Sequence, residues 1–430
     1  MNRWVQFILT GAISLVSVKA IAEDWSQYRG PAGAISPTKN IPTEWSDKKN
    51  VVWKADLPGP GSSSPIIVGD RVFITCYTGY GIPSGGDPSK LKRHLICINR
   101  LTGKTEWATG IDAVLPEDPY RGYIMEHGYA SSTPVSDGEN VYVFFGKSGV
   151  VAYDLAGNKL WQTSVGIESD NRRWGSASSP LLYKNMVIVN ASSESQSIRA
   201  LDKKTGLEIW KAEGAVLSLS FSSPAILKMP DGHDELIIAA PGEIWGLNPD
   251  TGKLRWFAEV NLSGNVCPSV VVGDGIVFVT GGFQSKGTVA VRGGGKDNVT
   301  KTHIVWTSRE SSYVPSPVLI NGKLYWVDES ARAVCLNAAT GETVSQQKLT
   351  LNGNGKNGKP IYGSIVSVAD KFILVTRNAG VLVLQGDSTF KTLITNKLPD
   401  ESDFNATPAV ANNQIFIRSN VAVYCIGSKL

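Results

Sequence analysis

The chain has 430 residues, long enough for two average domains or for one large all-β domain. Its 44 glycines and 22 prolines are typical of a turn-rich protein, and they are not concentrated in low-complexity tracts. The 42 basic residues nearly balance the 38 acidic ones, so the charge gives no reason to expect a nucleic-acid partner.

The first 22 residues have the features of a secretory signal peptide. Arg3 supplies a positive charge, residues 5–18 are mostly apolar, and residues 20–22 form a small-x-small cleavage site. A membrane anchor is the alternative, but this apolar stretch is shorter than the roughly 20 residues that a spanning helix needs. No cysteine lies near the cleavage site, which argues against a lipoprotein. We predict a mature protein that starts at Glu23, has no transmembrane segment and is periplasmic or secreted.

From residue 62 onward, one pattern occurs eight times: Ser/Thr-Pro, an alternating apolar strand, a Gly, Asn or Asp turn, and a second strand. The anchor positions of the eight copies are Pro65, Pro134, Pro180, Pro224, Pro268, Pro317, Ile365 and Pro408. The first spacing is 69 residues, because it contains an insertion at residues 77–94, and the others are 43 to 49 residues. Such a length fits one four-stranded propeller blade.

The second half of each copy joins two short strands through a tight turn. Asp154 and Asp202 begin such turns, where a carboxylate can accept a bond from the backbone two residues on, and Gly206 and Gly252 can adopt positive φ. A tryptophan follows on the predicted fourth strand, where its ring buries a large area between blades. These tryptophans are Trp53, Trp107, Trp161, Trp210, Trp256 and Trp306.

The last copy ends after its third strand, and the missing fourth strand matches residues 50–57 at the other end of the chain. We therefore predict an all-β, eight-bladed propeller at residues 50–430 whose last blade is closed by the N-terminal strand. Residues 23–49 form an N-terminal extension. Closing the ring in this way removes an exposed sheet edge.

At this point the sequence resembles a known family. Ala200, Asp202, Thr205, Gly206 and Trp210 match the Ala-x-Asp-x-x-Thr-Gly-x-x-x-Trp pattern of pyrroloquinoline-quinone (PQQ)-like propeller repeats. Residues 25–33 also resemble a group of exported PQQ-like propellers. The repeat occurs in quinoprotein alcohol dehydrogenases and in the non-enzymatic BamB-like outer-membrane assembly factors. The resemblance covers about residues 25–430 and implies the fold more strongly than any activity.

Five cysteines remain after the signal peptide. Cys97, Cys335 and Cys425 recur at a position of the third strand that otherwise holds Ala, Gly or Val, which favours small buried thiols there. Cys76 and Cys97 lie on adjacent predicted strands, so a disulfide between them stays open. With four histidines and no CxxC spacing, we predict no metal site of the cysteine–histidine type.

In a propeller, the loops before the first strands and the loops between the second and third strands share one face around the channel. These loops carry the candidate ligand-binding residues: Glu126, His127, Tyr129, Arg172, Arg173, Trp174, Asn265, Tyr313, Arg332, Tyr362, Arg377, Asp403 and Asn405. The insertion at residues 77–94 is a candidate lid or partner contact.

Two groups within this set have competing interpretations. His127 beside Glu126 could form an acid–base pair, but a local hydrogen-bonding role is favoured because no motif places a nucleophile nearby. Arg172, Arg173 and Trp174 could grip an anionic or aromatic ligand, or could form a solvated loop with one docked Trp. The Ser/Thr before each anchor recurs in almost every copy, which indicates packing rather than a nucleophile.

Two functions follow. The favoured one is a non-catalytic binding or scaffold propeller of the cell envelope, monomeric, with an envelope protein or a glycan as its partner and no assignable catalytic residue. The alternative is a PQQ-dependent alcohol or sugar oxidoreductase, in which Trp174, Arg172, Arg332, Glu126, Asn265 and Asp403 would hold PQQ and Ca²⁺. The chain lacks the adjacent cysteine pair of the enzymes, which favours the binding function.

Overall fold

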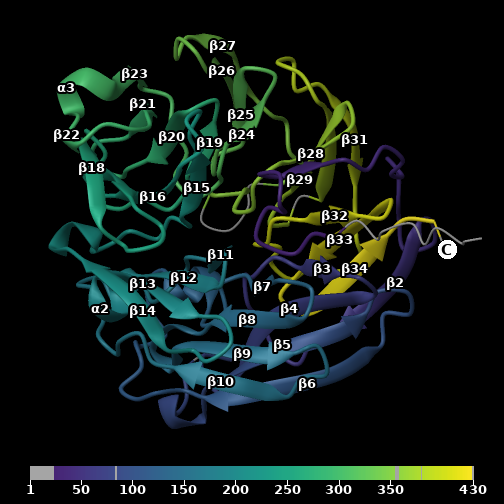
Figure 1. Ribbon diagram of the computed structural model, residues 1–430. Coiled ribbons are helices and arrows are strands. Elements are labelled where there is room, and N and C mark those ends of the chain that lie inside the picture. The colour runs from purple at the N-terminus through teal and green to yellow at the C-terminus, as the bar shows by residue number, and fades with distance from the viewer. Residues whose placement is uncertain (1–23, 83–84, 354–357, 379, 429–430) are drawn as a thin grey trace, which may run out of the picture.

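The computed structural model describes residues 24–82, 85–353, 358–378 and 380–428. Within them, eight β-sheets are arranged radially around a central axis (Figure 1). The predicted all-β, eight-bladed propeller is confirmed. The predicted signal peptide at residues 1–22 lies outside the described residues. None of the helices in the described part of the chain is long and apolar enough to cross a membrane.

The blades are numbered in chain order, and their strands are given from the channel outward. Blade 1 contains β3 (Ile66–Val68), β4 (Arg71–Thr78), β5 (Lys92–Asn99) and β6 (Thr105–Asp112). Blade 2 contains β7 (Val135–Ser136), β8 (Asn140–Phe144), β9 (Val150–Asp154) and β10 (Lys159–Thr163). Blade 3 contains β11 (Leu181–Tyr183), β12 (Met186–Ala191), β13 (Ser197–Asp202) and β14 (Glu208–Glu213). Blade 4 contains β15 (Ala225–Lys228), β16 (Asp234–Ala240), β17 (Glu243–Leu247) and β18 (Leu254–Glu259).

The second half of the ring repeats this order. Blade 5 contains β19 (Val271–Gly273), β20 (Ile276–Gly281), β21 (Gly287–Arg292) and β23 (Ile304–Ser308). Blade 6 contains β24 (Val318–Ile320), β25 (Lys323–Val327), β26 (Arg332–Asn337) and β27 (Thr343–Lys348). Blade 7 contains β28 (Val366–Val368), β29 (Lys371–Val375), β30 (Val381–Gln385) and β31 (Thr392–Asn396). Blade 8 contains β32 (Ala409–Ala411), β33 (Gln414–Arg418), β34 (Ala422–Ile426) and β2 (Val51–Asp56).

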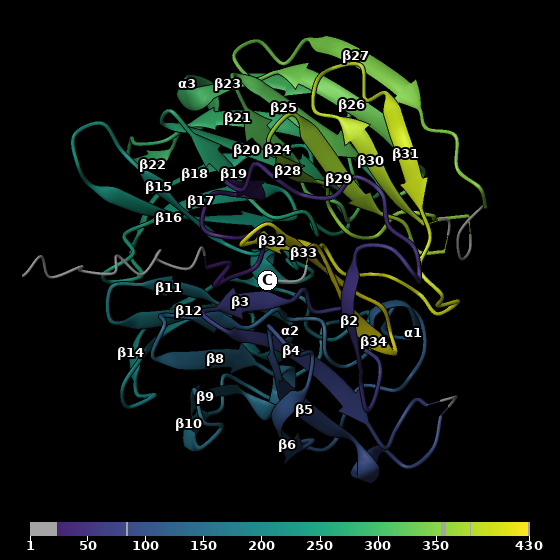
Figure 2. The same cartoon turned by 90° about the vertical axis from the view of Figure 1, so that its right-hand side faces the viewer.

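Short elements lie in the connections or extend the sheets. They are the strands β1 (Ile35–Ser36) beside β28 and β22 (Asp297–Asn298) beside β18, the helices α1 (Ile124–His127), α2 (Ser192–Ser195) and α3 (Thr300–His303), and the 3₁₀ turns η1 (Pro88–Lys90), η2 (Gly146–Ser148) and η3 (Ala215–Leu217). Figure 2 shows the ring from the side, with α1 on one face and the turn between β15 and β16 on the other. The first face is called the loop face below, and the second the turn face.

The ring closes as predicted. Strand β2 pairs antiparallel with β34, and Trp53 lies opposite Cys425. The N-terminal strand thus supplies the outermost strand of blade 8, so blade 8 joins the two ends of the propeller.

At five blade junctions, the tryptophan of one blade lies against a turn glycine of the next. The indole Nε1 donates to a backbone carbonyl of that turn at 2.7–3.1 Å. Each glycine has positive φ, and a Cβ on it would lie only 2.4–2.7 Å from the ring. The pairs are Trp53–Gly103, Trp107–Gly157, Trp161–Gly206, Trp210–Gly252 and Trp306–Gly341.

Trp256 departs from this pattern, because the segment that contains β22 and α3 replaces the tight turn in blade 5. Its ring packs against Gly246 within its own blade, and its Nε1 donates to Glu235 Oε2 at 2.9 Å. Trp256 is fully buried.

The structure corrects the anchor position of blade 5. Val271 pairs with Phe278 as Leu181 pairs with Ile188, so Val270, and not Pro268, is equivalent to Pro180. The loop before β19 is therefore two residues longer than predicted. It contains Val266, which forms an isolated bridge with Ser220 of the loop before β15.

All five cysteines are free thiols, so the disulfide left open between Cys76 and Cys97 is absent. Cys76 lies opposite His94, whereas Cys97 lies opposite Phe73. Positions 73 and 76 of one strand face opposite sides of a sheet, because side chains alternate along a strand. The two sulfur atoms therefore point to different sides of blade 1.

Candidate functional site

A row of aromatic side chains crosses the loop face of the channel. Ring centres are 6.1 Å apart for Phe221 and Trp174, and 4.5 Å apart for Trp174 and Tyr123. They are 5.9 Å apart for Tyr123 and Tyr313, and 5.8 Å apart for Tyr313 and Phe283. These five residues are called the aromatic row. It runs from a buried end at Phe221 to Phe283, which is 64% exposed.

Lys359 lies over the middle of the aromatic row. Its Nζ is 5.1 Å from the ring centres of both Tyr123 and Tyr313 and donates to the Tyr123 hydroxyl at 2.9 Å. Such cation–π contacts fix a long side chain between two rings. Lys359 also lines a side cavity of about 210 Å³ next to Tyr313, and no other lysine of the described residues does so.

Below the aromatic row, the channel holds a cavity of about 110 Å³ whose floor is a belt of hydroxyls. In the belt, the backbone N–H of one blade donates to the Ser or Thr hydroxyl of the next at 2.8–3.1 Å. The donor and acceptor pairs are Ser64 to Thr133, Thr133 to Ser179, Ser179 to Ser223, Ser269 to Ser316, Ser316 to Ser364, Ser364 to Thr407 and Thr407 to Ser64. Between blades 4 and 5, Val270 N–H instead donates to the Ser223 carbonyl at 3.4 Å. The hydroxyls therefore hold neighbouring blades together.

His127 is a buried side chain with both ring nitrogens in contact. Its Nε2 donates to the Trp174 carbonyl at 3.0 Å, and its Nδ1 lies 2.6 Å from Ser131 Oγ. Burial lowers the pKa of His127 to about 4, so the ring is neutral at pH 7. His127 thus fixes the loop that carries Trp174, which is a local hydrogen-bonding role.

Arg377 gathers the acidic side chains of this face. Its Nη1 lies 2.8 Å from Glu126 Oε2, and its Nη2 lies 3.3 Å from Asp403 Oδ2. Its guanidinium also lies over the Tyr362 ring, 5.5 Å from the centre, and Asn405 Nδ2 donates to the Glu126 carbonyl at 2.8 Å. The arginine and its two carboxylates together form one structural cluster.

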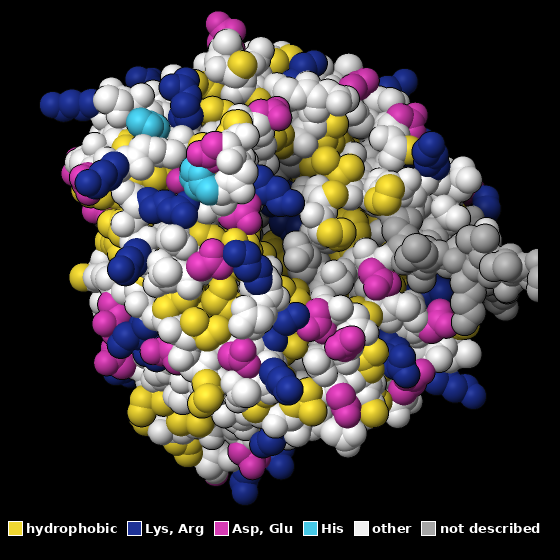
Figure 3. Space-filling view, viewed as in Figure 1, with side chains coloured by type: hydrophobic (Ala, Val, Ile, Leu, Met, Phe, Trp, Pro, Cys, Tyr) yellow, Lys and Arg dark blue, Asp and Glu magenta, His cyan; other side chains and the backbone are white. Residues whose placement is uncertain are grey.

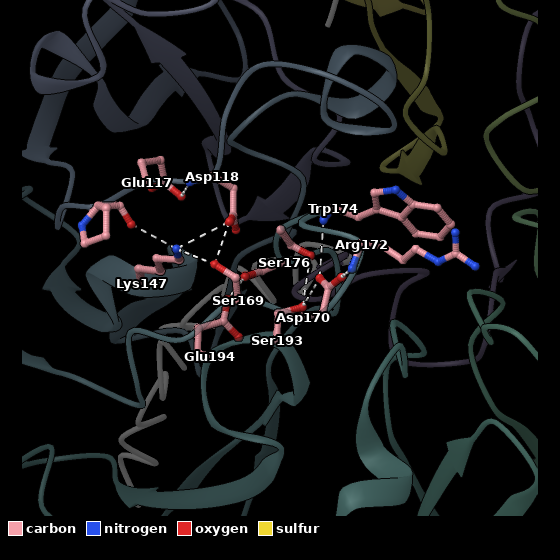
Figure 4. Close-up of polar contacts among 12 residues, drawn as sticks. Glu117, Asp118, Lys147, Ser169, Asp170, Arg172, Trp174, Ser176, Ser193 and Glu194 are labelled. Carbon is pink, nitrogen blue, oxygen red and sulfur yellow. Dashed lines mark hydrogen bonds and ion pairs between the residues drawn. The ribbon is translucent and has the colours of Figure 1, made fainter.

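Trp174 is positioned from behind by a buried polar network (Figure 4). The carboxylate of Asp170 accepts from the backbone N–H of Arg172 at 2.7 Å and of Trp174 at 3.3 Å, and also from Ser193 Oγ at 3.0 Å. Ser169, the residue before Asp170, accepts from Lys147 Nζ at 2.8 Å. The loop that carries Trp174 is thus anchored to blades 2 and 3 at several points, which preorganises the aromatic row.

Sequence comparison with known proteins supports one family. The family described as outer membrane protein assembly factor BamB matches residues 43–174 and 167–347. The chain belongs to the BamB family. It is 23% identical to BamB of Yersinia pestis over 339 residues, which span 74% of this chain and 75% of that protein.

Solved structures show the same fold. The crystal structure of BamB from Moraxella catarrhalis superposes with a TM-score of 0.61 at 14% identity and covers 88% of this chain and 98% of that one. A europium-containing methanol dehydrogenase superposes with a TM-score of 0.65 at 11% identity and covers 93% of this chain and 90% of that one. At such identities, the likeness establishes the propeller and leaves the function to the site itself.

In this BamB-family chain, most of the predicted site residues lie near the channel and four lie elsewhere. The channel cavity is lined by His127, Trp174, Tyr313, Tyr362 and Asn405. The side cavity is lined by Glu126 and Arg377, and Asp403 contacts Arg377. Asn265 contacts Cys267 and Tyr313. Arg172 and Arg173 are exposed, and the Arg172 guanidinium lies 5.9 Å from the centre of the Trp174 ring.

The other two of these four residues, Arg332 and Tyr129, belong to clusters outside the channel. Arg332 pairs with Glu310 at 2.8 Å and with Asp328 at 3.0 Å. Tyr129 donates to the Asp118 carbonyl at 2.7 Å and packs among other tyrosines away from the channel. Both side chains are already satisfied by partners within the BamB-family fold.

Four residues of the site were not predicted: Tyr123, Phe283, Lys359 and Tyr28. Tyr123 is the residue directly before α1 and lies three residues before Glu126, the first predicted site residue of this segment. Lys359 immediately precedes the Pro-Ile-Tyr segment that contains Tyr362. Tyr28 reaches the channel cavity from the N-terminal extension, which no repeat could place.

The residues present do not fit PQQ with Ca²⁺. The quinone carries three carboxylates, yet Arg377 is already neutralised by Glu126 and Asp403, and Arg332 lies in a separate cluster. Within the described residues, no group of three or more His, Cys, Asp or Glu side chains could hold a metal ion. The channel cavity of about 110 Å³ is also below the roughly 300 Å³ at which ligand pockets begin.

Proposed function

We propose that this chain is an exported, non-catalytic binding propeller of the cell envelope that supports outer-membrane protein assembly. Family membership supports the envelope role, because the family is described by that assembly function. The observation that carries the binding role is the aromatic row, which ends in an exposed phenylalanine on the rim of a preorganised channel.

The chemistry of the surrounding groups supports binding rather than catalysis. His127 is neutral and held by two partners, and the belt hydroxyls accept backbone bonds. A general base or nucleophile needs a reactive atom within reach of a substrate. The aromatic row instead offers apolar surface, and aromatic side chains are enriched at the centres of protein interfaces. An envelope protein is therefore the partner that we propose, and a glycan is the alternative occupant.

A complementation experiment tests this role. In a strain that lacks the gene, we expect the wild-type chain to restore the level of folded barrel proteins in the outer-membrane fraction. Phe283→Ser combined with Tyr313→Ser removes the outer part of the aromatic row and should fail to restore them. Leu207→Ser is the matched control, since Leu207 is 70% exposed in the turn between β13 and β14 of blade 3. Equal complementation by both variants would remove the aromatic row from the proposal.

A photocrosslinking experiment identifies the occupant. A photoreactive phenylalanine at position 283 should crosslink to one envelope protein in intact cells, whereas the same group at position 207 should not. Crosslinks to glycan alone, or the same crosslinks at both positions, would contradict a protein partner at the aromatic row.

A further inference from the structure

The N-terminal extension crosses the channel on the turn face, opposite the aromatic row. Trp25 forms a bridge with Ile67 of blade 1, and the Ser26 carbonyl accepts from the backbone of blade 2. Further on, Arg29 donates to the Pro317 carbonyl of blade 6, and β1 pairs with β28 of blade 7. The extension therefore spans the channel mouth and leaves the side of blades 3 to 5 uncovered.

A cavity of about 720 Å³ remains on this uncovered side. Its walls are more apolar than polar and come from the first strands of blades 3 to 5, from Leu319 of blade 6 and from the extension itself. They include Leu181, Ile226, Val271, Val272, Leu319 and Pro31. Figure 3 shows the turn face, which is hollowed at its centre and has Lys and Arg side chains at the edge of the hollow. The volume lies within the roughly 300–1,000 Å³ of small-molecule sites.

Arg29 lines this cavity and carries a buried charge. It is 5% exposed, and it donates from Nη2 to the carbonyls of Pro317 and Gly33. Among the described residues, its Nε has no hydrogen-bond partner and no acidic side chain forms an ion pair with it. A buried guanidinium is costly unless its charge is compensated, so this position favours an anion.

The backbone and the rim strengthen this preference. Arg29 has a φ of 62°, an uncommon conformation that the turn from Arg29 to Ala34 maintains. Lys228 also lines the cavity, and Asp234 is the one acidic residue in its described lining, whereas Lys184 at the rim is paired with Asp250 at 2.8 Å. Tyr28, Ser179, Ser223 and Ser269 line both this cavity and the channel cavity, so the two cavities adjoin at these residues.

We propose that the turn-face cavity binds an organic carboxylate, with the anionic group at Arg29 and an apolar body against the first strands of blades 3 to 5. This site is separate from the aromatic row, so it does not depend on the proposed assembly function. A carboxylate matches the planar guanidinium geometrically, and the apolar walls discriminate against small hydrated anions such as phosphate.

Calorimetric titration of the full chain with octanoate tests the proposal, with octan-1-ol as the neutral analogue and inorganic phosphate as the hydrated anion. We expect octanoate to bind with a Kd below about 1 mM and at least about tenfold more tightly than either alternative. Arg29→Gln should weaken octanoate binding by at least about tenfold, and Arg173→Gln, an exposed arginine near the opposite face, should leave it unchanged.

A second variant protects the test against a folding defect in Arg29→Gln. Ile226→Trp fills the cavity from blade 4, away from the buried guanidinium, and should also abolish octanoate binding. The proposal is overturned by any of three results: no octanoate binding up to about 10 mM, equal binding of octan-1-ol, or unchanged binding in folded Ile226→Trp. Binding of a short acidic peptide without binding of octanoate would also overturn it, because the cavity would then receive a side chain of a partner protein.

Discussion

Glu126 and Arg377 are 251 residues apart in the sequence, and their side chains lie 2.8 Å apart across the channel mouth. The contact joins α1, between blades 1 and 2, to the loop after β29 in blade 7. Because the arginine side chain is 1% exposed and also contacts Asp403, it is the buried cation of a cluster with two carboxylates.

We expect Arg377→Met to destabilise the protein by about 3–5 kcal/mol, because it leaves two carboxylates close together without their cation. The measurement is the free energy of unfolding in urea. Arg172→Met is the control and should change it by less than about 0.5 kcal/mol, since Arg172 is exposed. Adding Glu126→Gln and Asp403→Asn to Arg377→Met should recover part of the loss. No recovery would show that the loss comes from packing rather than from charge.

The contact between turn glycines and tryptophans predicts a difference between two glycine substitutions. Gly206 has a φ of 73°, and a Cβ there would lie 2.6 Å from the Trp161 ring. Gly138 has a φ of 91°, and a Cβ there would meet nothing within 4 Å. Gly138→Ala should cost about 1–2 kcal/mol from backbone strain alone, whereas Gly206→Ala should cost at least about 2 kcal/mol more. Equal losses in thermal unfolding would show that the indole moves aside without cost.

The cysteines are expected to react slowly, because four are buried and Cys267 is only partly exposed, in the lining of the channel cavity. Burial raises the pKa of Cys76 to about 11 and the pKa of Cys97, Cys267 and Cys425 to about 12. We predict very slow reaction of the native protein with a thiol reagent at pH 8, and five reactive thiols after denaturation without reductant. Three reactive thiols would instead indicate one disulfide in the purified protein.

The propeller could be predicted from the sequence because the residue types in its turns determine the local backbone conformation. In the turn that begins at Asp202, the carboxylate accepts from the backbone N–H of Lys204 and Thr205, and Gly206 takes the positive φ. Such signals are local and recur in most blades. In blade 5 the predicted anchor position is wrong by two residues. The loop before β19 is longer there, and Pro268 within it matches the proline of the repeat pattern.

The candidate site could be predicted only as a set of loops. Sequence position placed His127 and Trp174 on the same face, but not the contact of Lys359 with both Tyr123 and Tyr313. That contact depends on loops from different blades whose conformations no repeat specifies. The burial that makes His127 neutral likewise depends on packing across several loops.

The last prediction concerns Glu194, which is buried in the network behind the loop of Trp174. Its Oε1 accepts from Ser176, whereas its Oε2 has no hydrogen-bond partner among the described residues. Burial raises the pKa of Glu194 from 4.5 to about 7. The folded state therefore favours the protonated acid, and the contribution of this group to stability is lost as the pH rises from about 4.5 to about 7.

Glu194→Gln removes this titration. Relative to the wild type, the variant should gain up to about 3 kcal/mol of unfolding free energy between pH 4.5 and pH 7 and no more above that range. Urea unfolding of both proteins at several pH values measures this difference in unfolding free energy. The pH-dependent contribution of His127 has the opposite sign, but it cancels in the difference because both proteins retain His127. A difference that does not change with pH would show that Glu194 is solvated or paired when ionised. A difference that follows the predicted curve would identify this carboxyl as a proton-binding group directly behind the aromatic row.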